Sequence, residues 1–201
     1  MSELTALLVA SEAGGARNLI PILKFCSGNH VLYVVAKRGA IPLFVEAGVG
    51  IHLDVSISSV EDALEILDKI KANVVLCGRG IRQDSVERLF TVAARIRKIA
   101  SVGIIDEWYD YRANFSDELG VTTWPDVVCC PDSQAKYEAV IEGLPRNILK
   151  ITGSPALSSL FDQREKYKCS PPKNLDTLTQ NSIRPIIVFI SEVISDGLVT
   201  D

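Results

Sequence analysis

Short apolar runs of strand length recur at steady intervals along the chain. Most are continuous in valine, isoleucine and leucine instead of alternating with polar residues. The runs cover residues 4–10, 31–36, 51–55, 74–77, 102–105, 127–130, 148–151 and 186–190. Continuous apolar strands are typical of a parallel sheet that helices cover on both faces. The pattern therefore predicts an α/β fold built on a parallel sheet.

Two segments between these runs have helical periodicity. Residues 60–70 place their apolar side chains on one helical face, and Ser58 with Glu61 has the spacing of a capping box. A second apolar stripe predicts a helix over residues 83–98, which ends in basic residues as the helix dipole favours.

Two later helices are marked by their boundary residues. One is expected from Asp132, or the residue after it, to Gly143, and the other from the pair Ser154-Pro155. Strand and helix therefore alternate. We predict a doubly wound, Rossmann-like α/β domain over residues 1–166, with a mostly parallel sheet and helices on both faces.

Composition changes after residue 166. Residues 167–184 are polar, contain a proline pair and show no sustained period, so they read as a linker. Residues 185–201 then contain one strand-like run. A lone strand cannot form a domain, so this run is either the first strand of a second α/β domain that the chain lacks or an added strand of the first sheet.

Composition excludes several classes of protein. Of 201 residues, 21 are basic and 25 acidic, which gives a net charge of −4 and argues against a nucleic-acid partner. The apolar run at 4–10 is too short for an export signal or a membrane span. The five cysteines are odd in number and form no C-x-x-C pair, and there are two histidines. We therefore expect a soluble cytoplasmic protein without an integral membrane segment or a metal site.

Candidate site residues follow the ends of the predicted strands, where doubly wound sheets bind ligands. After the first run, Gly14 and Gly15 open a helix that also carries Arg17 and Asn18. Free N–H groups at such a helix start favour an anionic or polyhydroxyl ligand. The alternative is that the glycines only serve a tight turn. The loop has neither the G-x-G-x-x-G pattern nor a P-loop lysine, which disfavours a Rossmann dehydrogenase.

Two further strand ends carry charged residues. Gly78 and Arg79 follow the fourth run, and a guanidinium there suits a phosphate or carboxylate, although a solvated loop arginine is the alternative. Glu192 follows the last run and is a candidate if that strand is folded.

Residues 106–115 are the most informative stretch of the chain. Asp106, Glu107, Tyr109 and Arg112 lie within it, and rings beside carboxylates suit the face and the hydroxyl groups of a sugar. A carboxylate here could act as a general base on a hydroxyl. The alternative is a structural Ω-type loop whose aromatic residues pack on the sheet, with Trp108 filling the core.

The order of these motifs resembles a known type of protein. The motifs are residues 7–15 (LLVASEAGG), Asp106, residues 130–133 (CPDS) and residues 151–155 (ITGSP). They resemble the amino-terminal half of a two-Rossmann (GT-B-type) glycosyltransferase, a superfamily that includes lipid-A-disaccharide synthase and UDP-N-acetylglucosamine 2-epimerase. Residues 185–191 resemble the first strand of the second half.

The resemblance implies a function that needs a second half. It implies that this half supplies the acceptor side and some catalytic residues, while the carboxyl-terminal half holds most of the nucleotide-sugar site. We therefore expect the acceptor-side half of a glycosyltransferase-like protein acting on nucleotide-sugar-derived glycans. It would be active, as a transferase or an epimerase, only with a donor-binding domain or subunit. A non-catalytic binding or interaction module with a degenerate fold is the alternative.

The expected site follows from these motifs. The expected partners are a sugar or glycan acceptor, a donor-binding domain or subunit, or a second copy of the chain, with a nucleotide sugar as co-substrate and no cofactor. The expected catalytic residues are Asp106 and Glu107. The expected substrate-binding residues are Gly14, Gly15, Arg17, Asn18, Gly78, Arg79, Tyr109, Arg112 and Glu192.

Overall fold

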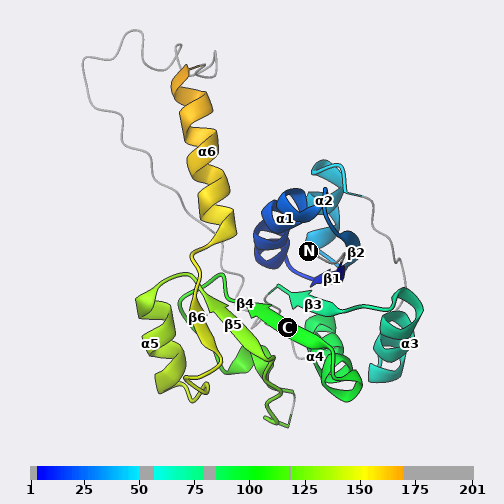
Figure 1. Cartoon of the computed structure of the whole chain (residues 1–201). Helices are drawn as coiled ribbons and strands as arrows, with labels where there is room; N and C mark the ends of the chain where they lie inside the picture. The colour runs from blue at the N-terminus through cyan, green and yellow to red at the C-terminus, as the bar shows by residue number, and fades with distance from the viewer. Residues whose placement is uncertain (1–3, 50–56, 79–84, 118, 170–201) are drawn as a thin grey trace, which may run out of the picture. The chain divides into compact units, whose positions relative to one another are not determined.

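A computed structural model of the chain describes residues 4–49, 57–78, 85–117 and 119–169 (Figure 1). The chain divides into one compact unit, Met1–Phe161, and a second, Asp162–Asp201. The sheet and the site described below belong to the first unit.

The described residues form a six-stranded sheet in which every neighbouring pair is parallel. Its strands are β1 (Thr5–Ala10), β2 (Val31–Ala36), β3 (Val74–Cys77), β4 (Ala100–Ile104), β5 (Val127–Cys130) and β6 (Leu149–Ile151). Their order is β2-β1-β3-β4-β5-β6. The predicted α/β class is confirmed. The apolar runs at 51–55 and 186–190 lie outside the described residues.

Helices cover both faces of the sheet. The helices of the described residues are α1 (Ala13–Cys26), α2 (Ala40–Glu46), α3 (Val60–Ile70), α4 (Val86–Arg97), α5 (Ser133–Ile141) and α6 (Pro155–Cys169), with a 3-10 turn, η1, at Ala113–Phe115. Leu7 and Val9 of β1 pack in one core with residues of α3 and α4, whereas Ala6 and Leu8 pack in another with residues of α1 and α2 (Figure 1). Burial of both sides of β1 explains why its sequence is continuously apolar.

The capping box predicted for α3 is displaced by one residue. Ser59, not Ser58, is the N-cap, and its hydroxyl accepts a hydrogen bond from the backbone N–H of Asp62. The carboxylate of Asp62 accepts in return from the N–H of Ser59. The prediction that paired Ser58 with Glu61 is wrong because the neighbouring serine and acid offer the same spacing one position later.

The other helix starts lie close to their predicted positions. Helix α4 is capped by Ser85, whose hydroxyl accepts from the N–H of Arg88, and α5 by Asp132, whose carboxylate accepts from the N–H of Ala135. Helix α6 begins at Pro155, as predicted, and continues to Cys169, three residues into the predicted linker. The rest of that linker and the last strand lie outside the described residues and stay predictions. No helix in the described ranges is both long enough and apolar enough to cross a membrane.

Candidate functional site

The order of the strands creates one preferred place for a ligand. From β1 the chain proceeds to β2 on one side, whereas β3 to β6 lie on the other side. In doubly wound sheets, ligands bind at the carboxyl ends of the two strands between which the order reverses, which are β1 and β3 here. Ser11 follows β1 and Gly78 follows β3, so the first two predicted loops begin at this point.

Gly14 and Asp106 meet at this edge although 92 positions separate them in the sequence. Gly14 lies in the first turn of α1, and a Cβ atom placed on it would lie 1.9 Å from Oδ2 of Asp106. Only glycine leaves room for the half-buried carboxylate there. The carboxylate therefore packs on the start of α1, where the helix dipole favours a negative charge.

Gly15 and Gly78 allow a second close approach. A Cβ atom on Gly78 would lie 2.6 Å from the Cα atom of Gly15, so the end of β3 packs directly on the backbone of α1. The N–H of Gly78 also donates to the carbonyl of Val9. These two glycines therefore have a packing reason to be glycine, and a ligand contact at either one stays a prediction.

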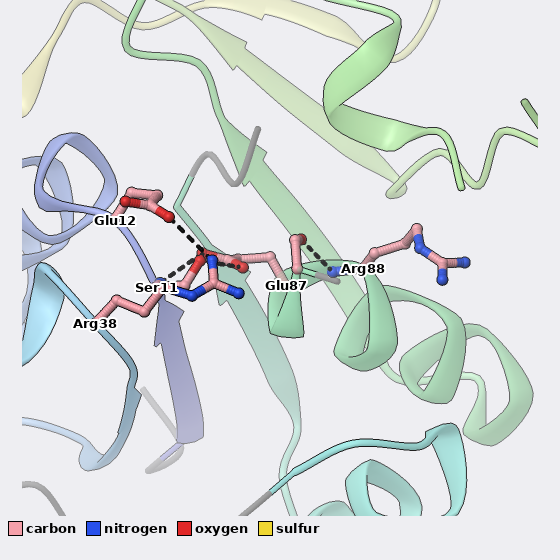
Figure 2. A network of polar contacts seen from close by, with 6 residues as sticks. Ser11, Glu12, Arg38, Glu87 and Arg88 are labelled. Carbon is pink, nitrogen blue, oxygen red and sulfur yellow. Dashed lines mark hydrogen bonds and ion pairs between the residues drawn. The ribbon is translucent and has the colours of Figure 1, made fainter. Parts of the chain in front are cut away.

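A buried carboxyl group holds the start of this turn. Glu87, in the first turn of α4, is 4% exposed, and its Oε1 accepts from the N–H of Ser11 at 2.6 Å. The hydroxyl of Ser11 lies 2.8 Å from Oε1 and 2.9 Å from Oε2 (Figure 2). Glu87 is not among the site residues predicted from the sequence. The available signal was its position on the same helical face as Phe90 and Ala94, both of which are buried.

An ion pair ties the neighbouring turn to the same loop. Arg38, which follows β2, lies 3.0 Å from the carboxylate of Glu12, the N-cap residue of α1 (Figure 2). The two side chains are 29% and 35% exposed, so solvent screens much of their attraction. The pair orients the turn more than it stabilises the fold.

Asn18 is committed to contacts within the protein. It is 2% exposed, and its Nδ2 donates to the carbonyl of Gly14. Its Oδ1 accepts from the hydroxyl of Ser154 and from the N–H of Ala156, both at 3.2 Å. Asn18 therefore joins α1 to the start of α6, which favours a positioning role over the predicted substrate contact. Arg17, one residue earlier, is exposed.

The loop that begins at Asp106 continues along α5. Trp108 Nε1 donates to Asp132, the hydroxyl of Tyr111 donates to Glu138, and the N–H of Arg112 donates to Glu142. The three acceptors are spaced along α5.

The backbone of Arg112 lies at the opposite end of α5 from the ring nitrogen of Trp108. Glu142 follows the last residue of α5 and Asp132 caps its first turn, so about 15 Å of helix lies between them. A substrate contact of the Arg112 side chain stays a prediction.

The aromatic residues of this loop divide into two groups. Tyr111 is fully buried in a core with Val128 and Ala135, and its burial raises the pKa of its hydroxyl group. Trp108 and Tyr109 are 44% and 54% exposed. The interpretation that Trp108 only fills the core is therefore wrong, because its ring faces solvent while its nitrogen is fixed by Asp132.

The remaining predicted residues add little to the geometry. Glu107 follows Asp106 and is half-buried. Arg79 and Glu192 lie outside the described residues. Across the four described ranges, no three potential ligands among His, Cys, Asp and Glu gather to hold a metal ion.

A small cavity adjoins the site on the α4 side of the sheet. It has about 20 Å³ of free space and is lined by Glu87, Arg88, Thr91 and Asn114, among others. That volume suits about one water molecule, not a sugar.

The fold of this chain is similar to that of known proteins, although its sequence is not. No protein-family model matches the sequence, and neither does any curated protein. Solved structures do match. UDP-GlcNAc 2-epimerase from Neisseria meningitidis bound to UDP-GlcNAc superposes with a TM-score of 0.64 at 13% identity, over 88% of this chain and 53% of that one. The Rickettsia bellii UDP-N-acetylglucosamine 2-epimerase gives 0.59 at 20% identity, over 88% and 51%.

This chain has the fold of one half of such a protein. A Methanocaldococcus jannaschii UDP-GlcNAc 2-epimerase in complex with UDP-GlcNAc and UDP also matches, with a TM-score of 0.63 at 13% identity over 87% of this chain and 53% of that one. The chain thus spans about half the length of the structures it matches. An amino-terminal half fits, and the resemblance inferred from the sequence is confirmed for the fold.

Proposed function

We propose that this chain binds a sugar at the carboxyl edge of β1, β3 and β4, as the acceptor-side half of a glycosyltransferase-like protein acting on nucleotide-sugar-derived glycans. The observation that carries the proposal is the contact between Gly14 and Asp106 at the point where the strand order reverses. The fold match to sugar-nucleotide enzymes supports it.

Asp106 has the central chemical role in this proposal. Its carboxylate lies at the start of α1, beside backbone N–H groups that can donate to sugar oxygens. A carboxylate in reach of a sugar hydroxyl can accept its proton as a general base. Glu107, the next residue, is the second carboxylate of the proposed site, and the exposed rings of Trp108 and Tyr109 offer apolar surface to a sugar face.

Turnover requires more than this chain in our proposal. A donor-binding domain or subunit would hold the nucleotide and close the edge against water. The chain alone is then expected to bind ligand without converting it.

The test is ligand binding to the chain and to matched carboxylate variants. Thermal unfolding is followed with added UDP-N-acetylglucosamine, N-acetylglucosamine or UDP, because a ligand at 100 times its Kd stabilises a protein by about 2.7 kcal/mol. Asp106→Asn is expected to weaken sugar binding at least about tenfold, or roughly 1.4 kcal/mol. Asp68→Asn is the control, since Asp68 pairs with Arg97 on the exposed surface of α3.

Two results would contradict the proposal. One is that none of the three ligands stabilises the chain. The other is that Asp106→Asn and Asp68→Asn bind the sugar equally well. If UDP stabilises the chain and N-acetylglucosamine does not, this half binds the nucleotide and not the acceptor, which would also contradict the proposal.

A further inference from the structure

Glu87 is a buried carboxyl group that has no role in the proposed function. It lies 76 positions from Ser11 in the sequence, yet both of its oxygens face that residue (Figure 2). Three oxygen contacts join the two side chains and the Ser11 backbone, at 2.6, 2.8 and 2.9 Å. All three lie within hydrogen-bond distance.

The geometry of these contacts and the burial of the side chain fit a protonated Glu87. Ser11 supplies its N–H and one hydroxyl hydrogen to three contacts, so an ionised Glu87 would receive two hydrogen atoms from this residue. An ionised Glu87 would share the single hydroxyl hydrogen of Ser11 between both of its oxygens, and its charge would be buried. A protonated Glu87 donates to the Ser11 hydroxyl from one oxygen and accepts both Ser11 hydrogens at the other, so every contact is a hydrogen bond.

The immediate surroundings agree with a neutral acid. Burial raises the pKa of Glu87. Hydrogen bonds from Ser11, Ser85 and its own N–H lower the pKa, but the effect of burial is larger. On the β3 side, the thiol of Cys77 donates to the backbone carbonyl of Glu87. That thiol is also neutral, because burial raises its pKa to about 12.

The charged groups around this site have other partners. Arg88, the next residue of α4, lies 3.8 Å from Asp117. Arg38, from the turn after β2, pairs with Glu12. The carboxylate from the β4 side, Asp106, packs on Gly14 and would repel a second negative charge in the same turn.

We propose that Glu87 is a positioning residue which, as a neutral acid, holds Ser11 and with it the first turn of α1, on which Asp106 packs. Only the consequence for ligand binding rests on the proposed function. When Glu87 loses its proton, a buried charge replaces the third hydrogen bond, and the turn that sets Gly14 against Asp106 loosens. The order of this turn is therefore expected to fall as the pH rises.

The first test compares Glu87→Gln with Glu87→Ala as the pH changes. Glutamine has a donating NH2 group and an accepting oxygen where the neutral acid has its O–H and its carbonyl oxygen, but it does not titrate. The pKa of Glu87 is raised on folding, so its contribution to stability is complete below about pH 4.3 and is lost as the pH rises toward the folded pKa. The Tm of Glu87→Gln minus that of the wild type should therefore rise between pH 4.5 and pH 8. A flat or falling difference would overturn the proposal.

The second test follows the turn directly by amide hydrogen exchange over residues 11–16 at pH 6. Glu87→Gln should exchange as the wild type does, whereas Glu87→Ala should exchange about tenfold faster or more there and unchanged over residues 61–70 of α3. Equal exchange in Glu87→Ala and the wild type would overturn the positioning role, and so would fast exchange in Glu87→Gln. Ligand binding is measured separately, so its absence would count against the proposed function and not against Glu87.

Discussion

At the scale of single residues, the three glycines of the site are glycine for different physical reasons. Gly14 leaves room for a carboxylate, while Gly15 and Gly78 let two backbones touch. The sequence marks all three as punctuation after strands, because glycine is favoured there whatever the cause. Which neighbour each glycine admits depends on residues far along the chain.

The contact at Gly14 predicts a strong coupling with Asp106. Gly14→Ala is expected to destabilise the protein by about 1–3 kcal/mol, because the new methyl group would displace the carboxylate. In the Asp106→Ala background the same change should be neutral or stabilising, since alanine is the better helix former by about 1 kcal/mol. Urea unfolding of the four proteins measures the coupling. An equal cost in both backgrounds would show that the two residues do not touch.

The anchor of Trp108 predicts a change at acid pH. Hydrogen bonds from the N–H of Ala135 and from Trp108 lower the pKa of Asp132. A lowered pKa means that these bonds are present above the unfolded value, near pH 4, and are lost as the pH falls through the folded pKa. The emission of Trp108, taken as the difference between the wild type and Trp108→Phe, should shift to longer wavelength below about pH 4. A spectrum that is constant down to pH 2.5 would contradict the anchor.

At the scale of elements, the helix starts show how local chemistry sets a boundary and where it is ambiguous. Ser85 and Asp132 cap their helices close to where the sequence places them. At α3 the chain offers two serines in a row, and the one whose hydroxyl meets the N–H of Asp62 becomes the cap. The cap is the serine that lets the apolar stripe of α3 face the core. The spacing between a serine and an acidic residue does not by itself distinguish the two serines.

The two serines predict unequal effects on stability. Ser59→Ala is expected to cost about 1 kcal/mol, the usual value for loss of an N-cap. Ser58→Ala should cost clearly less, because its hydroxyl only reaches the exposed Asp62 carboxylate, at 3.2 Å. Urea unfolding of both variants measures the difference. Equal costs would contradict the observed cap.

At the scale of the whole molecule, the position of a strand in the sheet determines how well its amides are protected against hydrogen exchange. In the described residues β1, β3, β4 and β5 are paired on both sides, while β6 has three residues and one paired neighbour. Protection against exchange follows burial and pairing, and the least stable elements open first.

This topology predicts an order of hydrogen exchange. Amides of β1, β3 and β4 should exchange only through global unfolding, whereas those of β6 and α6 should exchange through local opening with a lower free energy. Exchange measured at several urea concentrations separates the two routes. Equal protection of β6 and β1 would show that a further element covers the β6 edge.

The sequence by itself determined the fold class, six of the strands and the helices that show periodicity, because continuous apolar runs and capping residues act over short distances. It also indicated that loops at the strand ends would carry the site. Tertiary structure alone decided which residues of those loops meet. It brought Gly14 to Asp106, placed Glu87 beside Ser11 and set the backbone N–H of Arg112 against Glu142 at the end of α5. These outcomes depend on strand order and on side chains many positions apart, which no local pattern encodes.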